Sequence, residues 1–122
     1  MTKEELRDYC YSIGLIDSKF AKWEKSCYTS GYRYDGQFVN PYDFIAAWVE
    51  VKQSVAIAQS CEIDEDVFVN EPIRMLGISY VENDEEIKAR ISELIQSVQE
   101  NIKFLKWKQM KKSIEKIEGD FE

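Results

Sequence analysis

The sequence predicts an all-α protein, built as a single helical domain over residues 1–122. Three observations favour this class. Apolar residues recur at three- and four-residue steps in several stretches, capping residues precede these stretches, and glycines follow some of them. We expect an array of about five helices that ends in a long C-terminal helix. The pattern also allows one short β-hairpin near residues 32–39.

Two helices are expected at the start of the chain. A capping box formed by Thr2 and Glu5 predicts a first helix near residues 3–13, which Gly14 can end. Capping residues and a later glycine predict a second helix over about residues 17–31. The apolar residues of this second helix are Phe20, Trp23, Cys27 and Tyr28.

Residues 32–38 alternate between aromatic and other residues around Asp35-Gly36, a dipeptide that favours a hairpin turn. Because an isolated two-stranded ribbon is marginally stable, we expect a short hairpin or an ordered loop lying on the helices, and no sheet. The aromatic side chains here either cover the core or form a second binding surface. They are Tyr28, Tyr32, Tyr34, Phe38 and Tyr42.

A third helix is predicted from Pro41 to about Ser60, because Asn40 can cap it and proline suits the first helical position. It is apolar over much of its circumference, as a helix surrounded by others is. The residues expected in this central core are Phe44, Ile45, Ala47, Trp48, Val51, Val55 and Ala58.

The pattern between Glu62 and Tyr80 is weaker. Val67–Val69 suits a strand, whereas Asp64 could cap a short helix. Residues 72–77 begin with proline and end with glycine, which suggests one brief helix.

The last third of the chain, from Asn83 to Gly119, predicts one long helix. Asn83 can cap it and Glu86 can complete a capping box, so the helix should begin near Asp84. A first apolar stripe falls on one face of this helix and must meet a core. Its members are Ile87, Ile91, Leu94, Val98, Ile102 and Leu105.

A second apolar stripe follows on a face rotated by about 140° from the first. Its members are Trp107, Met110, Ile114, Ile117 and Phe121, with Phe104 between the two faces. Roughly 35 helical residues would span about 52 Å, whereas a chain of this size has a radius of gyration of about 14 Å. The helix therefore either breaks near residues 103–108 and folds back, or protrudes and offers its second stripe to another surface.

The charge changes sign at the same point. The whole chain carries a formal charge of −7, but the stretch 103–116 is basic. Its lysines are Lys103, Lys106, Lys108, Lys111, Lys112 and Lys116. An acidic patch is formed by Glu62, Asp64, Glu65, Asp66, Glu71, Glu82, Asp84, Glu85 and Glu86. Three interpretations stay open for the lysines: a solvated helix end, a helix that docks in a groove, or a basic segment that meets an acidic surface, including the chain's own.

Composition bounds the class of protein. The chain is 44 % hydrophobic and 13 % aromatic, which argues against disorder. No apolar run is long enough to cross a bilayer, and the N-terminal stretch is acidic where a signal peptide would be basic, so we expect a cytoplasmic protein. The cysteines at positions 10, 27 and 61 are odd in number and widely spaced, which predicts reduced thiols.

Several kinds of chemistry are missing. The chain has no histidine, which excludes imidazole bases and the common nucleophile triads, and its five glycines form no phosphate-binding loop. We expect no enzymatic activity, no cofactor and no metal. A remote alternative is a helical magnesium-dependent nucleotide hydrolase, because Glu82 with Glu85, and Glu5 with Asp8, have the spacing of its carboxylate pairs. Solvated helix ends account for the same pairs.

The chain resembles small uncharacterised helical proteins of Bacillus-type bacteria. The likeness runs from Tyr9-Cys10-Tyr11 through residues 40–44 to the lysine-rich ending with Phe104 and Trp107. It covers the whole chain but rests on no functional motif. It implies a helical fold, a cytoplasmic location and no assigned activity or site residue.

The leading functional prediction is a non-enzymatic module that binds another protein, or itself as a homodimer, through the amphipathic lysine-rich C-terminal helix. The predicted partner-binding residues are Phe104, Trp107, Met110, Ile114, Ile117, Lys103, Lys108 and Lys111. The alternative is a regulatory protein that contacts nucleic acid through the Lys103–Lys116 stretch. The acidic chain disfavours it, because a phosphate backbone demands a positive footprint.

Overall fold

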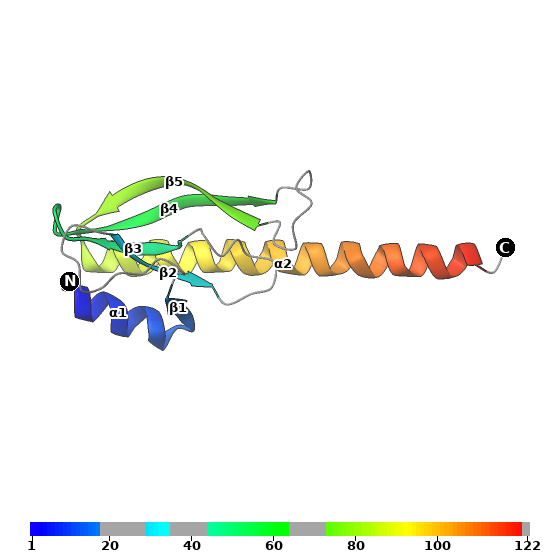
Figure 1. Ribbon diagram of the computed structural model, residues 1–122, viewed down its shortest axis with the longest axis horizontal. Helices are drawn as coiled ribbons and strands as arrows, with labels where there is room; N and C mark the ends of the chain where they lie inside the picture. Colours follow the sequence, from blue (N-terminus) through cyan, green and yellow to red (C-terminus); the bar gives the residue numbers. More distant parts are fainter. Residues whose placement is uncertain (18–28, 35–43, 64–72, 121–122) are drawn as a thin grey trace.

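The computed structural model describes residues 1–17, 29–34, 44–63 and 73–120 (Figure 1). These residues form an α+β fold, so the predicted all-α array of about five helices is wrong. The elements, in chain order, are α1 (Lys3–Ser12), β1 (Leu15–Asp17), β2 (Thr29–Tyr34), β3 (Ala46–Val49), β4 (Ser54–Ile63), β5 (Ile73–Val81) and α2 (Asp84–Asp120).

The strands form one antiparallel sheet in the order β1-β2-β3-β4-β5, so each strand pairs with its neighbours in the chain. Helix α2 lies along β4 and β5, and α1 lies next to β1. Helix α1 also contacts α2, because the Tyr9 hydroxyl lies 3.5 Å from the Lys88 backbone oxygen and 3.4 Å from Ser92 Oγ. The sheet and α1 thus gather around the first half of α2 (Figure 1).

The main core joins both helices to the sheet. Its fully buried members include Leu6 and Cys10 of α1, Ile57 of β4, and Ile87 and Ile91 of α2. Five of the six residues in the predicted first stripe of α2 are buried, and the sixth, Ile102, is partly buried against a smaller cluster. The prediction that this stripe faces the core is therefore confirmed.

The predicted third helix is wrong where residues 41–60 are described. They contain β3 and the first part of β4, which pair antiparallel with Ala46 opposite Ile57. The run from Ile45 to Trp48 is buried throughout, as is the run from Ser54 to Ala58. A continuous apolar run is typical of a doubly covered strand as well as of a core helix, and periodicity alone does not separate the two.

The turn between β3 and β4 gives no sequence signal for a hairpin. It consists of Glu50, Val51, Lys52 and Gln53, with neither glycine, proline nor asparagine. Gln53 nevertheless adopts a φ of 49°, the left-handed conformation for which glycine and asparagine are usually chosen. The predicted helix start at Asn40 and Pro41 lies outside the described residues.

The predicted second helix is also contradicted at its C-terminal end, whereas Asp17 has the extended backbone that an N-cap residue adopts as well. Asp17 ends β1, and Gly31, which was expected to end a helix, pairs with Ala47 inside the sheet. The rest of that prediction, including Phe20, Trp23, Cys27 and Tyr28, falls on residues 18–28, outside the described part of the chain.

The aromatic stretch contains a strand, as its alternation predicted, but this strand belongs to the sheet. Tyr32 and Tyr34 lie in β2, which pairs with both β1 and β3, so the expectation of no sheet is wrong. Tyr32 is fully buried and thus covers the core. The predicted Asp35-Gly36 turn, together with Phe38 and Tyr42, lies outside the described residues.

The brief helix predicted over residues 72–77 is instead the start of β5. Residues 73–76 extend along β4 because long-range pairing overrides a weak local preference. Gly77, expected to end a helix, sits inside the strand with a φ of 67°, next to the side chain of Gln59. The predictions for Asp64 and Val67–Val69 fall outside the described residues.

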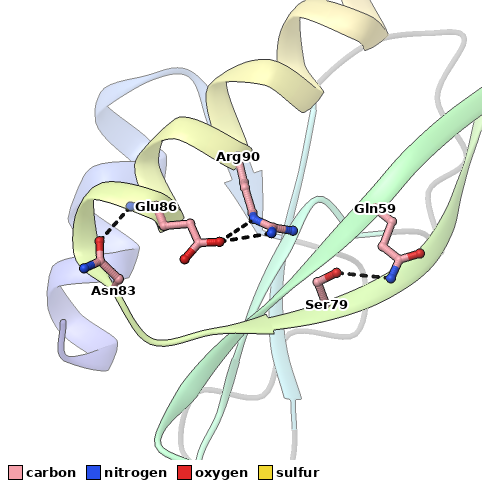
Figure 2. A network of polar contacts seen from close by, with 5 residues as sticks. All are labelled: Gln59, Ser79, Asn83, Glu86 and Arg90. Carbon is pink, nitrogen blue, oxygen red and sulfur yellow. Dashed lines mark hydrogen bonds and ion pairs between the residues drawn. The ribbon is translucent and has the colours of Figure 1, made fainter.

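The predicted side-chain cap is present at both helix starts, whereas the Glu86 carboxylate, expected to complete a capping box, pairs with Arg90. Thr2 Oγ1 accepts a hydrogen bond from the Glu5 backbone N–H at 3.1 Å, and Gly14 follows α1 with a φ of 89°. Asn83 Oδ1 accepts one from the Glu86 N–H at 3.0 Å (Figure 2). Each cap satisfies a backbone donor that the helix itself leaves free.

Helix α2 is continuous from Asp84 to Asp120, so it does not fold back near residues 103–108. Leu105 is the last buried member of its first stripe and packs near Ile73 of β5. Beyond Leu105 the helix extends past the sheet, with no other described element beside it (Figure 1).

Replacing Ile91 by alanine should lower the free energy of unfolding by about 2–5 kcal/mol, because a fully buried side chain would leave a cavity. Urea unfolding followed by circular dichroism measures this change. Gln96→Ala, on an exposed face of the same helix, should cost less than about 0.5 kcal/mol. Equal losses in the two variants would contradict the packing of α2 on the sheet.

Gly77→Ala should destabilise the protein more than Gly14→Ala. Positive φ costs a residue with a Cβ about 1–2 kcal/mol at either position. At Gly77 that Cβ would also lie 2.5 Å from Gln59 Oε1, whereas at Gly14 nothing lies within 4 Å. Combining Gly77→Ala with Gln59→Ala should recover part of the loss. Equal thermal midpoints for the two single variants would refute this reading of the close approach.

Candidate functional site

The second apolar stripe of α2 faces away from the core. Ile114 follows Leu105 by nine residues, and nine steps of about 100° bring it to the opposite side of the helix. The exposed fractions are 46 % for Phe104, 51 % for Trp107, 59 % for Met110 and 48 % for Ile114, against 8 % for Leu105. We call these four exposed residues the docking stripe. The side chain of Ile117, also predicted to bind a partner, lies outside those that the structure describes.

Two contacts order the start of the docking stripe. The rings of Phe104 and Trp107 lie 6.1 Å apart between centroids, at an interplanar angle of 33°. The ammonium group of Lys111 lies 5.3 Å from the centroid of the Trp107 ring, within range of a cation–π interaction. These side chains therefore present one joined aromatic surface with a positive charge at its edge.

The predicted lysines do not all lie on the same side of the helix. Lys103 and Lys111 are exposed, as are Lys106 and Lys112. Lys108 follows Leu105 by three residues, which turns it toward the buried side, and it is half-buried. The structure thus places Lys103 and Lys111 beside the docking stripe and Lys108 away from it.

The acidic residues at the start of α2 are too far away to meet the lysines near its end, whereas Asp64, Glu65, Asp66 and Glu71 of the predicted acidic patch lie outside the described residues. Asp84, Glu85 and Glu86 are exposed at the start of α2, and the 28 residues from Asp84 to Lys112 span about 42 Å of straight helix. Glu62 is engaged elsewhere, since it pairs with Arg74 at 3.5 Å. Contact between this acidic helix start and the basic end requires a second molecule.

A cavity of about 480 Å³ lies between β4 and the first half of α2. Sequence reasoning missed it, because it assigned the β4 residues to a helix. On its walls Arg90 pairs with Glu86 at 3.0 Å, and Gln59 donates to Ser79 Oγ at 3.1 Å (Figure 2). These four polar side chains are thus engaged in pairs with one another.

Cys61 lines the same cavity, and Cys10 lies in the main core. Burial raises the pKa of the Cys10 thiol to about 12. Burial also raises the pKa of Cys61, against the effect of a hydrogen bond that Asn101 Nδ2 donates to its sulfur at 3.3 Å. Because only the thiolate is a strong nucleophile, neither cysteine is set up for nucleophilic catalysis at neutral pH.

The carboxylate pairs of the magnesium hypothesis lie on the surface. Glu5, Asp8, Glu82 and Glu85 are all exposed. Among the described residues no group of three or more histidine, cysteine or acidic side chains could hold a metal ion. Nor does the described part of the chain include a helix long and apolar enough to cross a membrane.

The chain matches no known protein family, no curated protein and no solved structure. The resemblance to small proteins of Bacillus-type bacteria therefore stays a prediction, and the helical fold that it implied is wrong.

The Cys10 thiol should react with a disulfide reagent at least about 100-fold more slowly in the native protein than in urea, because it is buried and protonated. Its reaction rate should still rise with pH between pH 7 and pH 9 without reaching a plateau, because the thiol stays mostly protonated and the thiolate fraction keeps growing below a pKa of about 12. Alkylation followed by peptide mass spectrometry measures each site separately. Rapid native labelling of Cys10 would show that α1 does not cover it.

Proposed function

We propose that this protein is a non-enzymatic association module that binds another protein chain through the free end of α2. The observation that carries the proposal is the docking stripe, a row of four large apolar side chains that are about half exposed where α2 begins to extend past the described sheet. Single exposed apolar residues are ordinary, but contiguous rows of them are typical of interaction surfaces.

The energetics favour a partner that is itself apolar. Full burial of one large apolar side chain contributes about 1.5–3 kcal/mol. Since the docking stripe is already about half covered, its four side chains have roughly 3–6 kcal/mol left to gain. Association costs about 4–15 kcal/mol before any contact is counted. The partner must therefore contribute apolar surface of its own, as an amphipathic helix or a hydrophobic groove does.

The flanking charges add a second requirement. Lys103, Lys106 and Lys111 are exposed around the docking stripe, so carboxylates on the partner would be favoured and further cations penalised. We place the protein in the cytoplasm, a location supported by the free thiols of Cys10 and Cys61, which suit a reducing compartment.

Replacing Trp107, Met110 and Ile114 together by glutamine should abolish association and leave the fold intact. Urea unfolding should change by less than about 1 kcal/mol, because the three side chains lie outside the two core clusters. Sedimentation velocity and capture of proteins from a cell extract measure the loss of association. These substitutions are sharper than truncation at residue 104, which would also remove buried Leu105.

Leu105→Gln is the matched control, since it alters the buried side of the same helical turn and should reduce stability. If the triple variant unfolds as readily as this control, the stripe belongs to the core and the proposal fails. If the triple variant keeps every association of the wild type, docking through the stripe is refuted. Association that survives the triple variant and falls steeply with added salt would assign the lysines to nucleic acid instead.

A further inference from the structure

We propose that the partner of the docking stripe is a second copy of this chain, paired with the first as an antiparallel two-helix coiled coil. This inference rests on the proposed function and names its partner. Three observations carry it: the space around the free end of α2, the spacing of the stripe, and the distribution of charge along the helix.

The free end of α2 leaves room for a second helix. Trp107, Met110 and Ile114 of the docking stripe lie on the side of the helix away from Leu105, the residue through which the same stretch of helix contacts the sheet. A helix laid along the stripe would therefore avoid the sheet of the first copy. Helix α1 reaches only the first half of α2, where Ile13 lines a groove with Gln99 and Lys103. The stretch beyond Lys103 is thus open to a partner.

The stripe has the spacing of a coiled-coil seam. Trp107, Met110 and Ile114 follow one another at three and four residues, which corresponds to heptad positions a, d and a. The sequence continues this spacing to residues 117 and 121, both apolar. Earlier on the same face stand Glu93, Gln96 and Glu100, so the apolar seam is confined to the free end.

A two-fold axis makes this seam complementary to itself. In an antiparallel pair each a position faces a d position of the other helix. Centred near residue 112, this register sets Met110 of one copy opposite Ile114 of the other, and the reverse. The same surface then serves both molecules, as a two-fold interface requires. Each copy also supplies the apolar surface that the energetics demand of a partner.

Charge selects the antiparallel orientation. In a parallel pair Lys106, at position g, would face Lys111 of the other copy, at position e, and this repulsion would occur twice. Antiparallel pairing moves Lys106 to the last turn of the other helix, where the sequence contains Glu118 and Asp120. Antiparallel pairing also places the two Lys111 side chains on the same flank near the two-fold axis. Their repulsion is reduced because each ammonium group lies over the Trp107 ring of its own chain.

The net charge of the rest of each molecule also favours the antiparallel orientation. The chain carries −7 overall although its lysine-rich stretch is basic, so the part built from the sheet and α1 is more acidic still. Parallel pairing would place two acidic bodies side by side, whereas antiparallel pairing places them at opposite ends of the coiled coil. It also aligns the two helix dipoles in opposite directions.

The substitution Lys106→Glu should change the dissociation constant of the dimer in opposite directions for the two orientations. In the antiparallel pair the new carboxylate would face the acidic last turn, so dimerisation should weaken about three- to tenfold, as expected when two surface ion pairs become repulsive. In a parallel pair it would face Lys111 and dimerisation would tighten. Lys112→Glu is the matched control, since it makes the same charge change at an outward position and should alter the dissociation constant less than about twofold.

Sedimentation equilibrium at low salt gives the dimer dissociation constants of the wild type, Lys106→Glu and Lys112→Glu. Weakening by Lys106→Glu beyond that of Lys112→Glu supports the antiparallel pair. Tightening, or equal effects of the two substitutions, overturns it.

A distance measurement gives an independent answer. Spin labels attached through p-azidophenylalanine at position 112 should lie at the same level of an antiparallel pair, whereas labels at position 99 should be separated by about 39 Å along the axis. Equal label distances at both positions would overturn the antiparallel orientation.

If the wild type stays monomeric at millimolar concentration while the glutamine triple variant loses a captured protein, self-pairing is wrong and the proposed function stands. If the triple variant loses no association at all, both fail.

Discussion

The fold depends on the packing of one helical stripe against two strands. The stripe from Ile87 to Leu105 covers β4 and β5, and the same core receives Leu6 and Cys10 from α1. Without that stripe the sheet would lose the apolar cover of β4 and β5, because α1 lies at the other side of the sheet, next to β1 and with Tyr11 against Tyr32 of β2. Since the stripe ends at Leu105 while the helix continues to Asp120, the contact that stabilises the fold also fixes where the helix becomes free.

The helices were predictable because their signals are local. Side-chain caps such as Thr2 and Asn83 act within three residues, and the stripe of α2 repeats over many turns. The strands were not predictable in the same way. The β3–β4 hairpin combines a continuous apolar run, which a core helix would share, with a turn that lacks the usual residues. Its identity is decided by pairing with the neighbouring strands β2 and β5, which the residue pattern of this stretch alone does not reveal.

The candidate site was more predictable than the fold that carries it. The change of face between Leu105 and Ile114 follows from helical geometry alone, and it holds whether the rest of the chain is helical or a sheet. The sequence left open whether the helix would fold back, because that depends on whether another element covers residues 107–114. The position of Lys108 toward the buried side also follows from its spacing to Leu105.

Gly77 affects how β5, one of the two edge strands of the described sheet, can pair with another molecule. A strand at the rim of a sheet offers unpaired backbone groups to any extended peptide, and long flat rims are prone to uncontrolled polymerisation. The left-handed backbone at Gly77 interrupts the even pleat of β5 halfway along its length. The β5 edge is thereby divided into two short segments, which makes it a poorer template for the addition of another strand.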